Sequence, residues 1–391
     1  MRHKKIYFEA GALVADHFSG VGHYVQGIAQ AWDQYLAQPD HTVLQDKHHT
    51  RFTTTICASK YRVSRFSKFR LNNMRTKGFP LPSRLLHKFV DQGLLPPLDI
   101  WFGRGTYFFT NFVSYPLLKV PSATVVYDLS FEVVPQFADA NNRRYLSKMV
   151  RKAVYKSNLV VTISNHTKRQ LVDFYNISPK KVLVAYPAVD KALFYHRSDW
   201  EIAKVKHEYE LPNNYVLFVG NIEPRKNIST LIDAYIQLPH KYSKHFPLLL
   251  VGTNGWLSED IFNKLESARS AGYTIVRPKT YVEDIDMPAL YSGAAMMVYP
   301  SHYEGFGMPP LEAMSCGVPV ITSDNSSLPE VVGRAGLLVK STDTKGLSQT
   351  MLKLMSDDSL RASLTEKGYS QSQKFSWDTS AQKIYKALLE L

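Results

Sequence analysis

Residues 300–330 read PSHYEGFGMPPLEAMSCGVPVITSDNSSLPE, and the expected fold follows from this stretch. The apolar run at 294–299 is short, continuous and bounded by breakers, which is typical of a buried parallel strand. A glycine-bearing loop follows. Pro309 and Pro310 then suit the first turn of a helix, because their missing N–H groups need no partner there. A strand, a loop and a helix start in this order present free backbone N–H groups to a ligand.

Two glutamates, Glu304 and Glu312, stand at the two ends of this loop. An ionised glutamate accepts several hydrogen bonds, so the pair suits a hydroxyl-rich ligand such as a sugar better than a metal. The small residues of this turn, Gly305 and Gly307, let a ligand approach the main chain closely. A plain structural explanation also exists, in which Glu304 caps the helix and Glu312 is a solvated first-turn acid. The spacing alone leaves both explanations open.

The length of 391 residues predicts two domains, and the 45% hydrophobic content is that of a globular protein. No window approaches the roughly 18 to 20 apolar residues of a spanning helix, and the N-terminus lacks a signal-peptide pattern. We therefore expect a cytoplasmic protein. Cys57 and Cys316 are too few for a disulfide framework or a thiolate metal site, so each is expected as a small core residue.

The net charge of +13 is unevenly placed, with +15 in residues 1–200 and −2 in the remainder. Residues 51–89 contain ten basic side chains and no acidic one, and aromatic and aliphatic residues alternate with them. Such a segment can lie on an anionic membrane surface, where each basic residue adds about 1 kcal/mol. It can equally grip nucleic-acid phosphates, or form a solvated basic face.

Short apolar runs alternate with amphipathic helical patterns along the chain, which indicates doubly wound parallel sheets. The strands expected in the first part are 6–10, 52–57, 99–102, 123–127, 158–163 and 181–185. Those expected in the second part are 215–219, 247–251, 273–276, 295–299 and 319–322. The expected helices include 141–155, 165–175 with Ser164 as N-cap, and two closing helices near 359–367 and 377–389.

Residues 187–212 contain no run that is typical of a strand, and helix breakers and charged residues appear there instead. This predicts one domain at 1–195, a second at 196–375, and a helix at 376–391 that can pack back on the first domain. Gly20 and Gly22 open a helix after the first strand, although the third glycine of a dinucleotide fingerprint is absent. Ligands of open parallel sheets bind outside the carboxyl ends of the strands, so both glycine-bearing loops should face one cleft.

Two basic residues, Arg225 and Lys226, follow the first strand of the second domain in the segment GNIEPRKN. They stand just before a helix that is expected to start near Asn227. Adjacent cations have the wrong sign for a helix N-terminus unless an anion binds there. Together with free N–H groups they can neutralise a diphosphate, so a functional interpretation is favoured.

With these segments in place, the sequence resembles the retaining nucleotide-sugar glycosyltransferases of family 4. Glu304 and Glu312 enclose seven residues, which is that family's E-x7-E signature, and EGFGMPPLEAMSCGVPV matches around it almost throughout. The segments VGNIEPRKN, SNHTKRQL and SGVGHY also match. The resemblance implies a GT-B architecture, with two Rossmann-like doubly wound parallel-sheet domains facing an interdomain cleft.

The resemblance also implies residue roles. Arg225 and Lys226 would stabilise the diphosphate leaving group, and Glu304 would hold the donor sugar's hydroxyls, which makes these three the catalytic set. The residues implied to bind the donor are Gly22, Val282, Asp284, Gly305, Phe306, Gly307, Met308 and Glu312. Those implied on the acceptor side are His23, Tyr24, Tyr127 and Asp128. Two departures matter: Asn221 stands where many members have Arg, and Tyr127 stands where many have His.

Fixed cations at a departing diphosphate lower the barrier to breaking the anomeric bond. The resemblance implies front-face attack, with the leaving phosphate accepting the acceptor's proton. The sequence offers no metal-binding acidic triplet, so we expect a metal-independent reaction without a cofactor. The GVGHY and EPRKN segments resemble those of bacterial mannosyltransferases of O-antigen or exopolysaccharide assembly. We therefore expect GDP-mannose as the donor, with a UDP-sugar as the alternative.

The expected acceptor is a lipid-linked saccharide, because members of the family commonly act on such acceptors at the cytoplasmic leaflet. The segment 51–89 is then expected to hold the protein peripherally on the inner face of the cytoplasmic membrane, with no nucleic-acid partner. The alternative of another class is a nucleic-acid-binding protein that uses the same segment. That alternative leaves EGFGMPPLE and GNIEPRKN unexplained.

Overall fold

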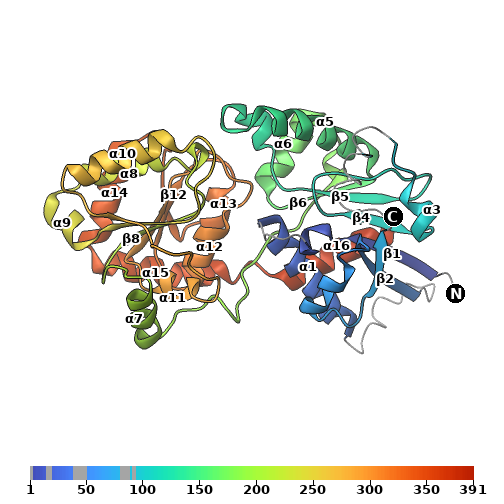
Figure 1. Cartoon of the computed structure of the whole chain (residues 1–391), viewed down its shortest axis with the longest axis horizontal. Coiled ribbons are helices and arrows are strands. Elements are labelled where there is room, and N and C mark those ends of the chain that lie inside the picture. Colours follow the sequence, from blue (N-terminus) through green and yellow to red (C-terminus); the bar gives the residue numbers. More distant parts are fainter. Residues whose placement is uncertain (1–2, 15–19, 38–50, 80–88, 90–93) are drawn as a thin grey trace. The chain divides into compact units, whose positions relative to one another are not determined.

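The structure is a computed structural model that describes residues 3–14, 20–37, 51–79, 89 and 94–391. The chain divides into two compact units. Unit 1 comprises Met1–Pro187 and Ser376–Leu391, and unit 2 comprises Ala188–Phe375. The expected boundary after residue 195 therefore lies a little inside unit 2, and the closing helix belongs to unit 1 (Figure 1).

The described part of unit 1 holds a seven-stranded, all-parallel sheet in the order β3-β2-β1-β4-β5-β6-β7. The strand order reverses between β1 and β4, which makes this the topological switch point where ligands of such sheets bind. The strands are β1 (His3–Glu9), β2 (Arg51–Ser59), β3 (Arg75–Phe79), β4 (Thr106–Phe109), β5 (Ser122–Val126), β6 (Leu159–Thr162) and β7 (Val182–Val184).

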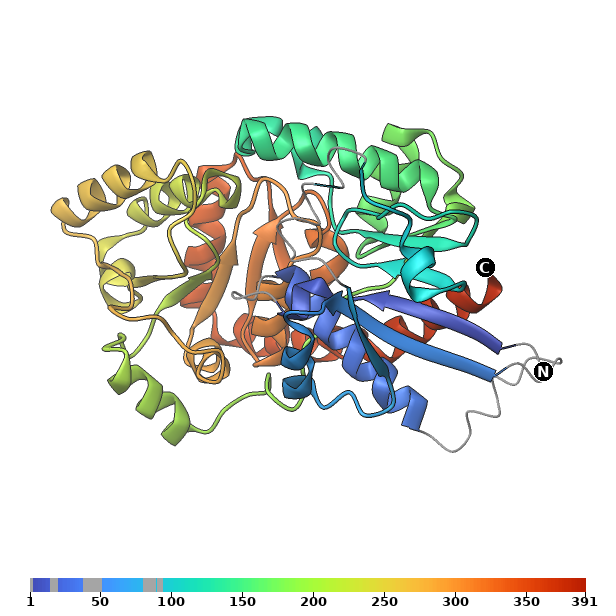
Figure 2. The same cartoon turned by 45° about the vertical axis from the view of Figure 1, so that its right-hand side comes forward.

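Two helices from opposite ends of the chain, α1 (Gly20–Ala37) and α16 (Trp377–Glu390), pack side by side in unit 1 (Figures 1 and 2). A Cβ at Gly27 would lie 2.4 Å from the Trp377 ring, so the close approach requires glycine. Trp32 of α1 contacts the ring of Phe8 on β1 and that of Tyr385 on α16. Further α-helices in the described part of this unit are α3 (Leu98–Phe102), α4 (Ser130–Val133), α5 (Ala140–Lys156) and α6 (Asn165–Tyr175).

Unit 2 holds a six-stranded, all-parallel sheet in the order β10-β9-β8-β11-β12-β13, which reverses between β8 and β11. The strands are β8 (Val216–Val219), β9 (Leu248–Val251), β10 (Ile275–Val276), β11 (Met296–Tyr299), β12 (Val320–Ser323) and β13 (Gly336–Val339). The helices are α7 (Asp199–Glu208), α8 (Ile228–Ile236), α9 (His240–His245), α10 (Glu259–Ser270), α11 (Met287–Ser292), α12 (Met308–Ser315), α13 (Leu328–Val332), α14 (Thr344–Ser356) and α15 (Asp358–Ser372). Among them, α8 packs with α10 and α14, while α12 packs with α11, α13 and α15. The expected doubly wound parallel sheets are therefore confirmed.

One expected strand is wrong. Residues 99–102 lie in helix α3, and the strand beside β1 is β4, which starts four residues later at Thr106. Asp99 accepts a hydrogen bond from the N–H of Leu118 at 2.9 Å, and Tyr7 donates to the carbonyl of Phe102, so contacts with distant segments hold the helical turn. The edge strands β3 and β13 were not expected.

Other expectations are confirmed. Ser164 caps α6, because its side chain accepts a hydrogen bond from the N–H of Thr167. Cys57 and Cys316 are free and buried. No helix within the described ranges is long and apolar enough to cross a bilayer.

Candidate functional site

The candidate site lies at the switch point of unit 2, outside the carboxyl ends of β8 and β11. After β8 the chain passes through Gly220, whose φ is +150°, into a 3-10 turn at Pro224–Lys226. After β11 it forms the loop 300–307 before α12 begins at Met308. The parallel sheet therefore brings two loops together that are almost eighty residues apart in sequence.

Four charged side chains form one cluster in these loops. Arg225 is ion-paired with Glu223 at 2.7 Å and with Glu304 at 3.2 Å. Lys226 is ion-paired with the other oxygen of Glu304 at 2.7 Å and lies 2.6 Å from the hydroxyl of Tyr299 at the end of β11. Two cations and two carboxylates are thus enclosed together, with side chains that are at most 18% exposed.

Burial and pairing act on these groups in opposite directions. Burial alone would raise the pKa of Glu304, but Lys226 and Arg225 outweigh it and lower that pKa to about 2. Burial lowers the pKa of Lys226, and Glu304 partly offsets this. Glu304 is therefore an ionised carboxylate at neutral pH, held between two cations.

Backbone hydrogen bonds tie the two loops to each other. The N–H of His302 donates to the carbonyl of Arg225 at 2.9 Å. The side-chain amide of Asn227 donates to the carbonyl of Pro300 at 2.9 Å and to that of Ser341 at 2.7 Å. Asn227 is left-handed, with φ +59°, which asparagine tolerates. These bonds fix the positions from which the charged side chains project.

The segment around Glu304 is held from a third direction, by two serines before and at the start of α13. The N–H of Glu304 donates to Ser326 Oγ at 3.1 Å. Ser327 Oγ lies 2.9 Å from the carbonyl of Glu304 and 2.6 Å from that of Phe306. The carbonyl groups of Glu304 and Phe306 thus face Ser327. This geometry is compatible with the expectation that other N–H groups of the turn bind a ligand.

Helix α12 starts at Met308, and its N-terminus has the expected free donors. The backbone N–H groups of Gly305, Gly307 and Met308 have no hydrogen-bond partner in the part of the chain that the structure describes. Gly307 has φ +123°, and a Cβ there would lie 2.8 Å from Leu328, so only glycine fits. No side chain of the described residues caps the helix, so Glu304 is not its cap.

Glu312 lies one turn into α12 and accepts a hydrogen bond from the buried hydroxyl of Tyr291 at 2.7 Å. Burial raises its pKa to about 7, with Asp284 adding to the rise and the Tyr291 bond opposing it. Glu312 is therefore not the solvated acid of the plain explanation. The structure places it within electrostatic reach of Asp284, which is exposed, whereas Val282 in the same loop is 5% exposed.

The residues expected on the acceptor side lie in unit 1. Tyr24 and Tyr127 contact each other edge to face, with ring centroids 5.3 Å apart. Their hydroxyls donate to the carbonyls of Ala185 and Thr110, which leaves both tyrosines as core residues with engaged donors. His23 is exposed at the start of α1, next to the buried Gly22. Asp128 accepts from the N–H and the hydroxyl of Ser130.

Sequence reasoning missed three residues of the unit 2 site: Glu223, Tyr299 and Tyr291. Glu223 is 1% exposed, and its Oε2 has no hydrogen-bond partner among the described residues. The sequence feature that could have identified Glu223 was its position in GNIEPRKN, two residues before Arg225.

Asn221, which stands where many family members have Arg, accepts a hydrogen bond from Thr253 Oγ1 at 3.0 Å. Among the described residues, no group of three or more His, Cys, Asp and Glu side chains is arranged to hold a metal ion.

Two family models match the chain. The model described as "Glycosyl transferases group 1" matches residues 199–371, which contain the whole ion-pair cluster. The model described as "Glycosyltransferase Family 4" matches residues 14–193.

Curated relatives agree with these matches. The chain is 36% identical over 258 residues to the O-antigen chain mannosyltransferase B of Escherichia coli, covering 66% of this chain and 67% of that protein. It is 31% identical over 282 residues to the serotype-specific mannosyltransferase WbdA of Escherichia coli, covering 69% of this chain. The second match spans 34% of WbdA, so this chain corresponds to about a third of that protein.

A solved structure of similar fold is Alr3699/HepE from Anabaena, in complex with UDP and glucose. It has a TM-score of 0.70 and 18% sequence identity, and the match covers 99% of this chain and 100% of that one.

Proposed function

Because the chain belongs to the group 1 glycosyltransferases and has their GT-B fold, we propose that it transfers mannose from GDP-mannose to a saccharide acceptor. The observation that carries the proposal is the cluster of Arg225, Lys226 and Glu304 beside the free N–H groups of α12. Cations and backbone donors suit a diphosphate, and a fixed carboxylate suits sugar hydroxyls. The names of the Escherichia coli relatives support mannose as the sugar.

In this mechanism the ion pairs of the cluster exchange partners when the donor binds. Arg225 and Lys226 neutralise the donor diphosphate, and Glu304, released from both cations, accepts hydrogen bonds from the sugar hydroxyls. Arg225 keeps Glu223 as its buried partner, which orients the guanidinium while its other face turns to phosphate. As the anomeric bond breaks, the two cations stabilise the charge that grows on the leaving diphosphate. Glu312 binds the nucleotide ribose.

The proposed reaction retains the anomeric configuration and needs no metal. The acceptor hydroxyl attacks from the face of the departing diphosphate, whose oxygen takes the hydroxyl proton, so no protein base is required. NMR of the first-formed product tests this, because an α-linked donor then gives an α-linked product. An inverted product would contradict the mechanism.

We further infer that the acceptor is lipid-linked and that residues 51–89 hold the protein on an anionic membrane surface. Within the described residues, Lys60, Tyr61, Lys68 and Arg70 are exposed, and Tyr61 is 64% exposed. Residues 80–88 lie outside the described part. Co-sedimentation with vesicles of anionic and of neutral lipid tests the inference, with the variant Lys60→Ser/Lys68→Ser/Arg70→Ser as comparison. Vesicle binding that survives these changes, or RNA binding that exceeds it at equal salt, would contradict it.

The donor is tested by a thermal-shift panel on the full chain, since a ligand stabilises a fold by RT ln(1 + [L]/Kd), or about 2.7 kcal/mol at 100 Kd. GDP and GDP-mannose should raise Tm more than UDP and UDP-glucose at equal concentration. Release of GDP from GDP-mannose in the absence of acceptor gives a second readout. A larger shift with UDP-sugars would replace the donor, and no shift with any nucleotide would overturn the proposed function.

A further inference from the structure

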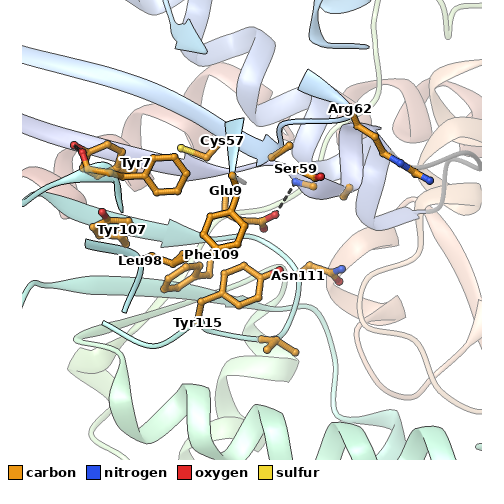
Figure 3. A pocket seen from close by; sticks show the side chains of 16 residues that line it. Tyr7, Glu9, Cys57, Ser59, Arg62, Leu98, Tyr107, Phe109, Asn111 and Tyr115 are labelled. Atoms are coloured by element: carbon orange, nitrogen blue, oxygen red, sulfur yellow. Dashed lines mark hydrogen bonds between the residues drawn. The ribbon is translucent and has the colours of Figure 1, made fainter. Parts of the chain in front are cut away.

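Unit 1 contains a cavity of about 240 Å³ at its own switch point, between the carboxyl ends of β1 and β4 (Figure 3). Side chains alternate between the faces of a strand, so Tyr7 and Glu9 of β1 share the face opposite to Phe8 and the α1 side. Neighbouring strands add side chains to the same face. The lining residues include Tyr7, Glu9, Cys57, Tyr107, Asn111 and Val113.

One end of the cavity is apolar, and the residues that line it are buried. Figure 3 shows Tyr7, Cys57, Leu98 and Tyr107 gathered there, and none of these residues is more than 6% exposed. The polar atoms at this end are already engaged. Tyr107 donates to the carbonyl of Gly103 at 2.8 Å, and Tyr7 donates to that of Phe102. A ligand group in this part therefore meets ring faces and aliphatic carbon.

The other end is polar and more open to solvent. Ser59, Asn111 and Arg62 lie toward it in Figure 3, with Glu9 between the two ends. The carboxylate of Glu9 accepts a hydrogen bond from the N–H of Gly11 at 2.7 Å through Oε1. Its other oxygen, Oε2, makes a longer contact of 3.5 Å with Thr110 Oγ1. Glu9 is part-buried and Asn111 is exposed. Polar groups of a ligand find partners at this end.

These two ends discriminate between ligand classes. A saccharide ring buried at the apolar end would leave several hydroxyls without partners, and each unpaired hydroxyl would lower the affinity. A hydrocarbon chain has no such cost, and each CH₂ group that it buries adds to the affinity. At roughly 30 Å³ for each water-sized group, the cavity holds about eight such groups.

We propose that this cavity binds the hydrocarbon segment of an amphiphile, with the amphiphile's polar group placed at Glu9 and Asn111. The proposal deepens the proposed function, on which its biological meaning rests, because it gives a lipid-linked acceptor a binding site of its own in unit 1. Pockets of this kind are mostly apolar, and a few polar groups fix the ligand's orientation.

The test compares n-octyl β-D-glucopyranoside below its micellar concentration with methyl β-D-glucopyranoside, on the full chain. The octyl compound should raise Tm in a saturable way, and the methyl compound should not. Cys57 lies on the cavity wall, so in a Cys316→Ser background the octyl compound should also slow the alkylation of Cys57 by N-ethylmaleimide. Cys57→Phe fills the apolar end and should weaken octyl glucoside binding at least tenfold.

Val113→Phe fills the cavity from another segment and serves if Cys57→Phe does not fold. Leu118→Phe adds an aromatic ring at a position that is 63% exposed and should bind octyl glucoside like the wild type. Equal stabilisation by the methyl compound, no saturable binding of the octyl compound, or unchanged binding in a folded cavity-filling variant would each overturn the proposal. No readout uses a nucleotide, so the proposed function can fail or stand independently of this result.

Discussion

The two switch points of this molecule have the same backbone construction and opposite chemistry. In unit 2, the loops after β8 and β11 enclose two cations and two carboxylates. In unit 1, the ends of β1 and β4 border an aromatic cavity, and Glu9 is the one carboxylate among the described residues that line it, between the apolar and polar ends. The same sheet topology thus carries two different sites.

The difference teaches that the fold fixes where a ligand binds, while a few side chains fix which ligand it is. The charges of the cluster cancel only when all of its members are present, so removal of one member leaves another buried charge without its partner. An apolar cavity is insensitive to charge and sensitive to volume. The predictions below separate these two kinds of dependence.

The largest effect is expected for Lys226→Ala. Loss of a cation at the leaving diphosphate should lower kcat by about 100- to 1,000-fold, or roughly 3 to 4 kcal/mol of transition-state stabilisation, while the fold is kept. Lys264→Ala is the matched control, because Lys264 pairs with Asp233 at 2.6 Å on the surface of the same unit. The control should retain near-normal turnover. Near-normal turnover of Lys226→Ala by steady-state assay would contradict the assigned role.

The next effect concerns Glu304 and acid. Burial opposes ionisation of Glu304, but Lys226 and Arg225 lower its folded-state pKa to about 2 from the ordinary 4.5. A lowered pKa gives stability that is present above pH 4.5 and lost as pH falls from 4.5 toward 2. Urea unfolding of wild type and Glu304→Gln should differ by on the order of 3 kcal/mol at pH 6 and converge on acidification. A difference that stays constant from pH 6 to pH 3 would exclude the pairing as its cause.

A smaller effect is expected for Glu312, whose pKa burial raises to about 7. If the ionised carboxylate of Glu312 binds the ribose, only enzyme molecules in which Glu312 is ionised bind the donor well. With a pKa of about 7, the fraction of such molecules rises about tenfold between pH 6 and pH 8. The donor KM of the wild type should therefore fall by up to about tenfold over this range. In Glu312→Gln it should be nearly flat. An equally steep profile in the variant would assign the titration to another group.

The smallest effect is expected for Glu9, and its sign is opposite to that of Glu304. Burial raises the pKa of Glu9, so its contribution to stability is greatest below the ordinary value of 4.5 and is lost as pH rises through the raised value. Unfolding experiments should show Glu9→Gln gaining stability relative to the wild type as pH rises from 4 to 8. A relative loss over that range would mean that Glu9 is stabilised as a carboxylate, like Glu304.

Local sequence patterns predicted the central strands of both sheets except β4, and much of the unit 2 site. The apolar runs at β8, β9, β11 and β12 are buried, short and continuous, so their length and the breakers beside them identify them as strands. Among the edge strands, β7 and β10 were expected from their apolar runs, whereas β3 and β13 were missed. The sequence of β3, RTKGF, has no apolar run, and no residue of β13 is fully buried. Residues 99–102 were read as a strand, because the tertiary bonds that hold α3 leave no trace in the local pattern.

For the site, the sequence alone determined the types of groups available: Arg225, Lys226 and Glu304 after expected strands, Glu312 in the first turns of an expected helix, and Gly307 in the loop before that helix. These follow from short-range rules of strand, turn and helix start. Only the tertiary structure decided that Glu223 and Glu304 neutralise the two cations and that Glu9 borders a cavity built from several strands. The physical reason is that a parallel sheet brings together segments that are far apart in sequence, and both burial and charge pairing depend on those distant neighbours.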